Sequence, residues 1–410
     1  MAEWTIKRCL EWTTEYLGGK GDENPRLSAE WLLTSATGLP RIRLYTDYDK
    51  PLTPEELSRL HGAVVRRAKG EPLQYIAGET SFRTITVACG PGVLIPRPET
   101  EMLVEEVLAY IDRAVLGSPE GRRSRSRAAL PWNAEVEAAR RAELEAAARR
   151  AAEQEGSDRA DGDAGEGSDA PASDRVDAPA SDAVPGAGDG AAEGQGDPGE
   201  ACGAPCPTDP EDAAAPAVAR VLEVGCGTGC ISLSIAAERP GRVRCVSTDI
   251  EPRAVALARR NRDALGIPPE EADFREGNLV SPLDRATEWG TFDVLVSNPP
   301  YIPTSVMARL PREVADFEPG LALEGGADGL DIFRRLVNAA PSMLRPGGLL
   351  ACELHETTLD AAADICRAAG FEDVRIVDDL AGRPRIVVAV VPESAVLEAR
   401  RRFGAGSPGR

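Results

Sequence analysis

The sequence predicts an α/β fold in which a mainly parallel sheet carries helices on both faces, preceded by a small helical domain. From Arg220 to Val391, short apolar runs alternate with longer amphipathic segments, an order typical of parallel sheets. A glycine-rich turn directly follows the first apolar run, and ligands in such sheets bind beyond the carboxyl ends of the strands. The first 75 residues instead carry apolar side chains at helical spacing.

The N-terminal part is predicted to be a small bundle of helices. Trp4–Leu17 and Leu27–Leu39 carry apolar residues at helical spacing. Thr53-Pro54-Glu55-Glu56 combines a capping box with proline at the first helical position, which predicts a helix to about Lys69. A bundle of this size is too small to be a whole enzyme, so we assign residues 1–75 to a helical N-terminal domain.

Residues 76–116 are predicted to form a β-hairpin and a joining helix. Thr84–Val87 and Val93–Ile95 are β-like segments on either side of a Gly-Pro-Gly turn. Pro98–Tyr110 then has apolar residues along one side of a helix. We expect this part to connect the helical domain to the sheet.

Residues 117–217 have a different composition from the rest of the chain. Asn133–Gln154 is rich in Ala, Glu and Arg, which predicts a solvated helix. From Ala160 to Ala217 there are fourteen acidic residues, one arginine and almost no large apolar side chain. Such a segment buries too little surface to offset its chain entropy. We predict an inserted, acidic, largely disordered segment, and favour a passive linker over an acidic interaction arm.

Residues 218–395 are predicted to form the catalytic domain, and residues 396–410 a disordered tail. Strands are expected at Val221–Val224, Val243–Asp249, Asp293–Ser297, Gly348–Glu353 and Arg385–Val391, with a further strand ending after Phe274. Helices are expected at Cys230–Ala237, Arg253–Leu265, Leu330–Leu344 and Thr358–Ala369.

Charge and cysteine content indicate the compartment and argue against one class of partner. The net charge of −20 disfavours long-range attraction to nucleic acid phosphates. Met1–Leu10 has no apolar core typical of a signal peptide, and no apolar run reaches the length of a membrane span. Nine scattered cysteines, an odd number, favour reduced thiols. We therefore predict a cytoplasmic protein without a membrane partner.

The glycine-rich turn predicts a cofactor site. An apolar strand, Val221–Val224, runs into a G-x-G-x-G turn, and Asp249 ends the second strand twenty residues beyond that turn. Glycines leave room for a ligand against the backbone, and an acidic residue at this place can accept hydrogen bonds from ribose hydroxyls. The pattern differs from the dinucleotide G-x-G-x-x-G, and it suits S-adenosylmethionine, which has no pyrophosphate, better than NAD. The predicted cofactor-binding residues of the turn are Gly225, Cys226, Gly227, Thr228 and Gly229.

A loop after the third strand is predicted to complete this site. Asn278 is placed to hydrogen-bond the adenine amino group, and Leu279 to cover the adenine ring. The alternative for Asn278 is an ordinary loop asparagine.

The most specific motif is Asn298-Pro299-Pro300-Tyr301, which ends an apolar strand. The two prolines have a fixed φ and lack N–H groups, so the Asn298 side-chain oxygen and the Pro299 carbonyl form a rigid pair of acceptors beside the Tyr301 ring. Two fixed acceptors can hold a planar NH2 group, and they favour the positive charge that grows on its nitrogen during methyl transfer. The motif itself leaves open whether the nitrogen belongs to adenine, cytosine, guanine or glutamine.

This chemistry needs no strong base and no metal. The sequence has two histidines, His61 and His355. We expect His61 to be solvated, while His355 is the one placed to border the site. The Cys226/Cys230 and Cys202/Cys206 pairs lack further residues at zinc-ligand spacing, so we predict no metal site.

Several further segments resemble one family, the protein-(glutamine-N5) methyltransferases, and within it the release-factor glutamine methyltransferase (HemK/PrmC) group. The segments that carry this resemblance are Glu71–Gly78, Ser81-Phe82, Leu94–Glu101, Phe317-Glu318-Pro319 and Leu323–Asp331, beside the motifs above. Together they cover about Glu71–Glu101 and Val221–Val391, with a looser match in the helical N-terminus.

The resemblance implies the fold and activity of that group. It implies a class I S-adenosylmethionine-dependent methyltransferase, Rossmann-like with a mainly parallel seven-stranded sheet, whose helical N-terminal domain docks the substrate. The implied reaction methylates the N5 amide nitrogen of the glutamine in the Gly-Gly-Gln motif of peptide-chain release factors and yields S-adenosylhomocysteine. Asn298, Pro299, Pro300 and Tyr301 match the glutamine-binding positions. Gly225, Gly227, Gly229, Asp249 and Asn298 match cofactor positions, and Arg97 and Thr100 are implied to line the cofactor pocket.

Three departures and three alternatives accompany this resemblance. The insertion is atypical, Asn278 stands where the family usually has aspartate, and Glu353-Leu354-His355-Glu356 replaces a usual Glu-x-Gly. The alternatives are a glutamine methyltransferase of a ribosomal protein, an amino-methyltransferase of nucleic acid, and a non-catalytic adaptor. A nucleic-acid enzyme should show a basic, aromatic-lined surface, and an adaptor should have lost Asn298 or Asp249.

Overall fold

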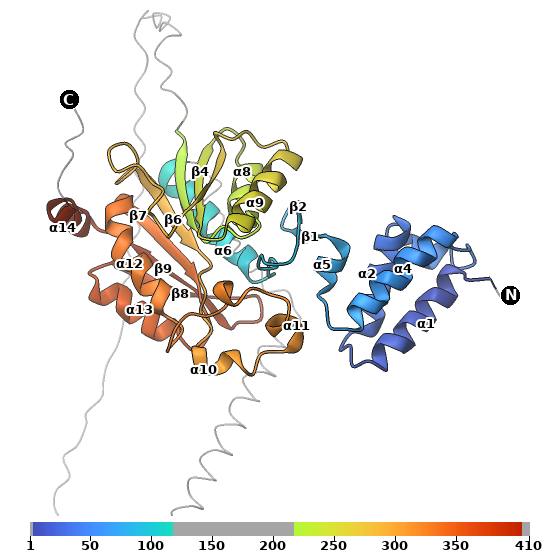
Figure 1. Cartoon of the computed structure of the whole chain (residues 1–410). Helices are drawn as coiled ribbons and strands as arrows, with labels where there is room; N and C mark the ends of the chain where they lie inside the picture. Colours follow the sequence, from blue (N-terminus) through green and yellow to red (C-terminus); the bar gives the residue numbers. More distant parts are fainter. Residues whose placement is uncertain (1–2, 118–216, 404–410) are drawn as a thin grey trace, which may run out of the picture. The chain divides into compact units, whose positions relative to one another are not determined.

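The N-terminal region of the computed structural model is helical, as the sequence predicts (Figure 1). The structure describes residues 3–117 and 217–403. The helices are α1 (Ile6–Gly18), α2 (Pro25–Thr37), α3 (Arg43–Thr46), α4 (Pro54–Arg67) and α5 (Leu73–Ala77). The predicted capping box is confirmed, since Thr53 and Glu56 each accept a hydrogen bond from the backbone of the other. Apolar side chains from α1, α2 and α4, including Leu10, Leu33 and Leu60, form one core cluster.

A two-stranded hairpin follows, in a different place from the one expected. β1 (Glu79–Phe82) and β2 (Ile85–Ala88) are antiparallel and turn at Arg83, whose φ is +50°. The predicted strand at Val93–Ile95 is wrong, since these residues lie in no strand. Val93 packs against α9 side chains and Ile95 against Tyr75, so their apolar character serves burial in an irregular segment. We call residues 92–100 the joining segment.

The second region contains a sheet of seven strands in the order β5-β4-β3-β6-β7-β9-β8. The first five strands of this order are parallel, while β9 is antiparallel to both β7 and β8. The predicted class I methyltransferase fold is confirmed. The strands are β3 (Ala219–Val224), β4 (Val243–Asp249), β5 (Ala272–Glu276), β6 (Phe292–Ser297), β7 (Leu344–Glu353), β8 (Glu372–Asp378) and β9 (Pro384–Val390).

Helices cover both faces of this sheet (Figure 1). Successive side chains of a strand point to opposite faces, so Val221 belongs to a cluster with side chains of α6, α8 and α9, and Leu222 to a cluster with side chains of α12 and α13. The helices are α6 (Thr100–Tyr110) with its π-helical extension η1 (Ile111–Val115), α8 (Cys230–Glu238), α9 (Pro252–Ala264), α10 (Thr304–Met307), α11 (Arg312–Ala315), η4 (Gly320–Ala322), α12 (Asp331–Met343), α13 (Leu359–Ala368) and α14 (Glu393–Phe403).

Two features near the C-terminus differ from the sequence-based expectation. β8 was not expected, because its side chains at this sheet edge are mostly exposed or half-buried and form no apolar run. Residues 396–403 of the predicted disordered tail are helical, since α14 continues to Phe403 and Val396 is 1% exposed within a core cluster. Residues 404–410 and nearly all of the predicted insertion at 117–217 lie outside the described residues.

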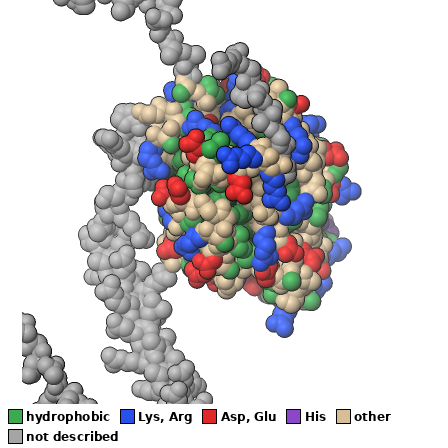
Figure 2. All heavy atoms as spheres, turned by 90° about the vertical axis from the view of Figure 1, so that its left-hand side faces the viewer, with side chains coloured by type: hydrophobic (Ala, Val, Ile, Leu, Met, Phe, Trp, Pro, Cys, Tyr) green, Lys and Arg blue, Asp and Glu red, His purple; other side chains and the backbone are tan. Residues whose placement is uncertain are grey.

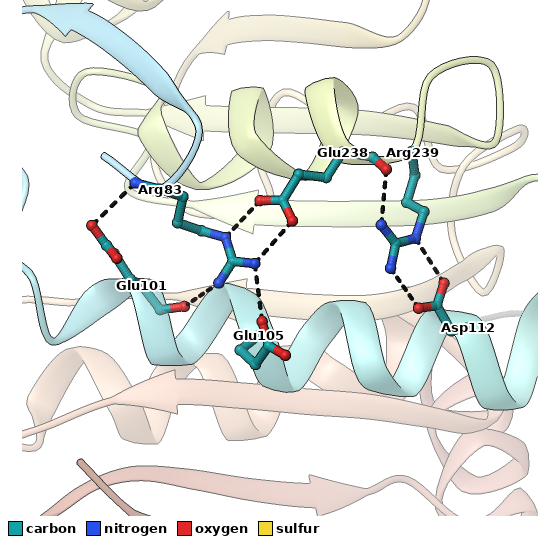
Figure 3. Close-up of polar contacts among 6 residues, drawn as sticks. All are labelled: Arg83, Glu101, Glu105, Asp112, Glu238 and Arg239. Atoms are coloured by element: carbon teal, nitrogen blue, oxygen red, sulfur yellow. Dashed lines mark hydrogen bonds and ion pairs between the residues drawn. The ribbon is translucent and has the colours of Figure 1, made fainter. Parts of the chain in front are cut away.

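A network of ion pairs joins α6 to α8 (Figure 3). The Arg83 guanidinium donates to both carboxylate oxygens of Glu238, at 2.6 and 2.9 Å, and to Glu105 at 2.9 Å. Farther along, Arg239 donates to both oxygens of Asp112, at 2.8 and 2.5 Å. Bidentate guanidinium–carboxylate pairs impose a defined geometry, so this network restrains α6 on the sheet, including its first residue, Thr100.

The surface carries charges of both signs on the side that includes α14. Figure 2 shows arginine and lysine side chains interspersed with aspartate and glutamate on this face. Such a mixture does not form the continuous basic stripe that nucleic acid binding favours.

Candidate active site

A cavity of about 250 Å³ lies where the carboxyl ends of β3, β4, β5 and β6 meet the joining segment. It therefore lies beside the point where the strand order reverses, the usual ligand site of such sheets. Its wall contains residues 92–97, 223–228, 248–251, 277–279 and 297–300, together with Thr100, Cys230, Ile231, Ala254, Pro319, Leu321, Ala322, Ile332 and Arg335. Of the predicted site residues, all line this cavity except Gly229 and Tyr301.

The glycine turn has the backbone that only glycine adopts readily. Gly225, Gly227 and Gly229 have φ of +80°, +53° and +82°. A β-carbon on Gly225 would lie 4.0 Å from the Asn298 carbonyl oxygen and one on Gly227 3.9 Å from Val93, both ordinary van der Waals distances. A β-carbon on Gly229 would lie 3.0 Å from both Ala258 and Phe274. The first two glycines thus leave room in the cavity, and the third allows α8 to pack closely.

Asp249 is hydrogen-bonded to the backbone of the glycine turn. Its Oδ2 accepts from the Gly227 N–H at 2.9 Å, and its Oδ1 accepts from the Glu251 N–H at 2.9 Å. Burial raises the pKa of this carboxyl, and the two N–H groups oppose that rise. Because each carboxylate oxygen accepts two hydrogen bonds, Asp249 can hold the turn and still bind a ligand hydroxyl.

Glu223 is a second acidic residue in the wall, and its place before the glycine turn supports the cofactor prediction together with Asp249. It is fully buried, and its Oε2 accepts from the Ser247 hydroxyl at 3.0 Å, while its Oε1 has no partner. Burial raises its pKa to about 7. The signal in the sequence was an acidic residue within an apolar strand, two positions before the first glycine.

The predicted adenine loop is held by two hydrogen bonds. Asn278 Oδ1 accepts from Arg335 of α12 at 3.0 Å, and the Leu279 carbonyl accepts from the Thr248 hydroxyl at 2.7 Å. Leu279 has a positive φ of +52°, which is unusual for a residue with a β-carbon. Arg335 was not predicted, because nothing local distinguishes it from other arginines of an amphipathic helix.

The joining segment closes the cavity by contacts with a loop after β6. Arg97 donates to Glu318 at 2.5 Å, and the other oxygen of Glu318 accepts from the Ile95 N–H at 3.4 Å. The Glu318 side chain is 1% exposed, so this ion pair is shielded on the side of the carboxylate. Arg97 is thereby held in the cavity wall.

The Asn-Pro-Pro-Tyr motif begins at the end of β6 and contributes its first three residues to the cavity. Asn298 Nδ2 donates to the Thr100 hydroxyl at 3.1 Å. Tyr301 points elsewhere: its ring centroid lies 6.4 Å from that of His355, and it packs against the core on the α12 side of the sheet. Burial and the nearby Glu353 carboxylate raise the pKa of Tyr301 to about 12, so its hydroxyl is neutral at ordinary pH.

A buried glutamate lies behind Asn298. The Thr100 hydroxyl donates to Glu353 Oε2 at 2.6 Å, and Thr100 and Glu353 are each 2% exposed. Burial raises the pKa of Glu353 to about 7. The sequence analysis recorded Glu353 only as part of an unusual segment, since its approach to Asn298 depends on the pairing of β7 with β6.

The remaining candidates are consistent with chemistry that lacks a histidine base. His61 is exposed, and His355 is half-buried with its Nδ1 2.9 Å from the Thr357 hydroxyl.

Within residues 3–117 and 217–403, no three His, Cys, Asp or Glu side chains form a group able to hold a metal ion. In the same part of the chain, every helix is too short or too polar to span a membrane.

Two family models match this chain. The model described as the PrmC N-terminal domain matches residues 8–78, and that of the methyltransferase small domain matches residues 212–309. Together they cover the helical N-terminal region and the half of the sheet region that contains the glycine turn and Asn298.

Curated relatives match almost the whole chain. The release factor glutamine methyltransferase of Geobacter sulfurreducens is 34% identical over 94% of this chain and 96% of its own. That of Chlorobaculum tepidum is 31% identical over 92% of this chain and 94% of its own. Among solved structures, a methyltransferase from Pyrococcus furiosus is 20% identical, with a TM-score of 0.32 over 43% of this chain and 76% of its own.

Proposed function

This chain belongs to the release factor glutamine methyltransferase family, and we propose that it methylates the side-chain amide nitrogen, N5, of the glutamine in the Gly-Gly-Gln motif of peptide-chain release factors. The methyl donor is S-adenosylmethionine. One observation carries the proposal: the glycine turn and Asn298-Pro299-Pro300 line the same cavity. A methyl donor bound at the turn and an amide held at the motif would therefore meet without a change of fold.

The donor set on one side of the cavity suits S-adenosylmethionine. This cofactor supplies an electrophilic methyl group on a positively charged sulfur. The partnerless Oε1 of Glu223 is suited to its ammonium group, and Asp249 to its ribose hydroxyls. Asn278 and Leu279 are proposed to contact the adenine, and Arg97 and Thr100 to line the pocket from the joining segment. Gly225 and Gly227 line the cavity without a side chain, which leaves room for the ligand backbone.

Asn298 and Pro299 are proposed to hold the glutamine amide. The two N–H groups of the amide donate to Asn298 Oδ1 and the Pro299 carbonyl, which directs the nitrogen toward the methyl group. As the new C–N bond forms, the S–CH3 bond breaks and S-adenosylhomocysteine leaves with the electron pair. Positive charge develops on the nitrogen, where acceptor dipoles stabilise it, and the nitrogen then loses a proton to water.

The other parts of the chain have proposed roles that follow from this reaction. Residues 1–75 dock the release factor, residues 76–116 connect this domain to the catalytic domain, and residues 117–217 are a linker without a role in catalysis. Tyr301 is proposed to contact the substrate glutamine after a side-chain rotation, because its ring packs beside His355 here. A cytoplasmic location agrees with a substrate that acts on ribosomes.

The direct test is incubation with S-adenosylmethionine labelled in its methyl group and purified release factors, followed by mass spectrometry of the labelled peptide. The expected product is N5-methylglutamine within Gly-Gly-Gln. A ribosomal protein and a nucleic acid serve as parallel substrates. Label on either of these, with none on a release factor, would replace the proposal with the corresponding alternative.

A further inference from the structure

Three side chains form a continuous hydrogen-bonded chain from the cavity to the interior. Asn298 lines the cavity, and its Nδ2 lies 3.1 Å from Thr100 Oγ1, which in turn lies 2.6 Å from Glu353 Oε2. Thr100 is the first residue of α6, and Glu353 is the last residue of β7. Glu353 itself is absent from the cavity wall, so it acts on any substrate only through the other two.

The number of hydrogens in this chain determines its direction. A threonine hydroxyl has one hydrogen, and an ionised carboxylate only accepts. When Glu353 is ionised, Thr100 must donate to it, and the Thr100 oxygen can then only accept from Asn298. The Asn298 amide must therefore point its NH2 at Thr100, which leaves Oδ1 for the cavity. A protonated Glu353 removes this constraint, because it can donate to Thr100 and leave the hydroxyl hydrogen for Asn298 Oδ1.

We propose that ionised Glu353 is a positioning residue that acts through Thr100 to orient the Asn298 amide, so that its oxygen faces the substrate nitrogen. This inference rests on the proposed function, because an acceptor at Asn298 matters only for a substrate that donates N–H. With the amide reversed, Asn298 presents an NH2 group to the substrate NH2, and the two donors repel. The orientation therefore separates a productive site from an unproductive one.

The surroundings of Glu353 bring the pKa of its carboxyl close to neutral pH. Burial raises its pKa to about 7, and the hydrogen bond from Thr100 opposes this rise. Glu99, at the start of α6, raises the pKa further, and Arg385 of β9 lowers it. Tyr301 and Cys230 also lie near this carboxylate, and both are neutral because their own pKa values are raised. Glu353 is therefore ionised above about pH 7 and protonated below it.

The position of Thr100 is also defined by contacts away from the cavity. The ion pairs of Arg83 with Glu105 and Glu238 restrain α6 against α8 (Figure 3), and the Tyr110 hydroxyl donates to the Gly347 carbonyl of β7 at 2.6 Å. Since α6 is held at several points, the Thr100 hydroxyl has little freedom to leave Glu353. A preorganised support of this kind is what a catalytic hydrogen bond needs.

The test compares Thr100→Val, Thr100→Ser and Glu353→Gln with the wild type, using a purified release factor at saturating S-adenosylmethionine. Valine keeps the shape of threonine without its hydroxyl, so kcat should fall by about 10–100-fold, the usual effect of losing a group that orients a functional residue. Serine should restore kcat to within about threefold, since it keeps the hydroxyl. Cofactor affinity, measured by calorimetry, should change little in Glu353→Gln, whose side chain lies outside the cavity wall.

The pH profile separates this role from a merely structural one. Wild-type kcat should fall as the pH drops through about 7, because protonation of Glu353 releases the amide. In Glu353→Gln and Thr100→Val, the acid limb should disappear and leave a low, flat profile. Glu356→Gln and Thr357→Val are matched controls at exposed positions of the neighbouring loop, and both should keep the wild-type profile.

The inference and the proposed function fail in different ways. A wild type that does not methylate release-factor glutamine overturns the function. An active wild type whose kcat is flat from pH 5.5 to 8, or an active Thr100→Val with the wild-type acid limb, overturns the inference and leaves the function intact. The pH profile of the wild type is measured without any variant. It therefore tests the inference even if Thr100→Val folds poorly.

Discussion

The two sides of the cavity are built in different ways. The cofactor side consists of Glu223, the glycine turn 225–229 and Asp249, which lie within a short stretch of chain, and Asp249 accepts a hydrogen bond from the Gly227 N–H of the turn. The acceptor side consists of Asn298, Thr100 and Glu353, where Thr100 is 198 residues from Asn298 and 253 from Glu353. The first side depends on local backbone geometry, and the second on tertiary contacts between side chains.

This difference implies that the two sides control different steps. Changes on the cofactor side should alter cofactor affinity and stability, because the turn is both a binding surface and the start of α8. Changes on the acceptor side should alter the rate of transfer, because Asn298 is the proposed acceptor for the reacting nitrogen and Thr100 and Glu353 are proposed to orient it. The following substitutions test this division.

The largest effect is expected for Asn298→Ala. It removes the side-chain acceptor for the reacting amide, so kcat should fall by about 10²–10³-fold, as for the loss of a group that stabilises transition-state charge. The cofactor dissociation constant, measured by calorimetry, should stay within about threefold of the wild-type value. Loss of cofactor binding with kcat retained at saturation would reverse the assignment of the two sides.

A smaller effect is expected for Asp249→Asn, and it should appear in cofactor affinity instead of kcat. Asparagine keeps the shape but has one acceptor oxygen for the Gly227 N–H, the Glu251 N–H and a ribose. Cofactor affinity should fall by about 10–100-fold, since hydrogen bonds to charged groups are worth about 1.5–3 kcal/mol. At saturating cofactor, kcat should be nearly unchanged. Asp263→Asn on the exposed side of α9 is the control and should alter neither quantity.

Gly229→Ala tests whether the cofactor side depends on the backbone conformation and close packing of the glycine turn. The new β-carbon would lie 3.0 Å from Ala258 and Phe274 at a φ of +82°, so strain and overpacking should together lower the free energy of unfolding by about 2–4 kcal/mol. Gly241→Ala has a similar φ, +70°, with no neighbour within 4 Å. Its cost in denaturant titrations should be about 1 kcal/mol. Equal losses for the two variants would show that packing at Gly229 is unimportant.

The smallest effect is expected for deletion of residues 156–217. The cavity-wall residues that the structure describes lie before or after this segment, and its composition offers little apolar surface for burial. Turnover of a release factor should therefore change by less than about twofold. A large loss of kcat/KM for the release factor, with cofactor affinity intact, would assign the segment to substrate binding in place of a linker.

Much of the fold and the cofactor side was predictable because the signals are local. The capping box at Thr53 and the alternation of strands and helices each depend on neighbours in the chain. Predictions failed where burial overrode local pattern. Val93–Ile95 is apolar because it packs under the cavity, and Val396 extends α14 because it reaches the core. The sequence of β8 contains no apolar run, because this strand lies at the edge of the sheet and most of its side chains are exposed or half-buried.

The amino-acid sequence by itself determined which residues can have unusual backbone conformations, since glycine and proline limit φ through their own covalent structure. That was sufficient to place the glycine turn and the Asn-Pro-Pro motif in one predicted site. Tertiary structure alone decided that Tyr301 packs beside His355 and that Glu353 lies behind Asn298. The physical reason is that a hydrogen bond between side chains depends on distances of a few tenths of an ångström, which arise only when α6, β6 and β7 have packed together.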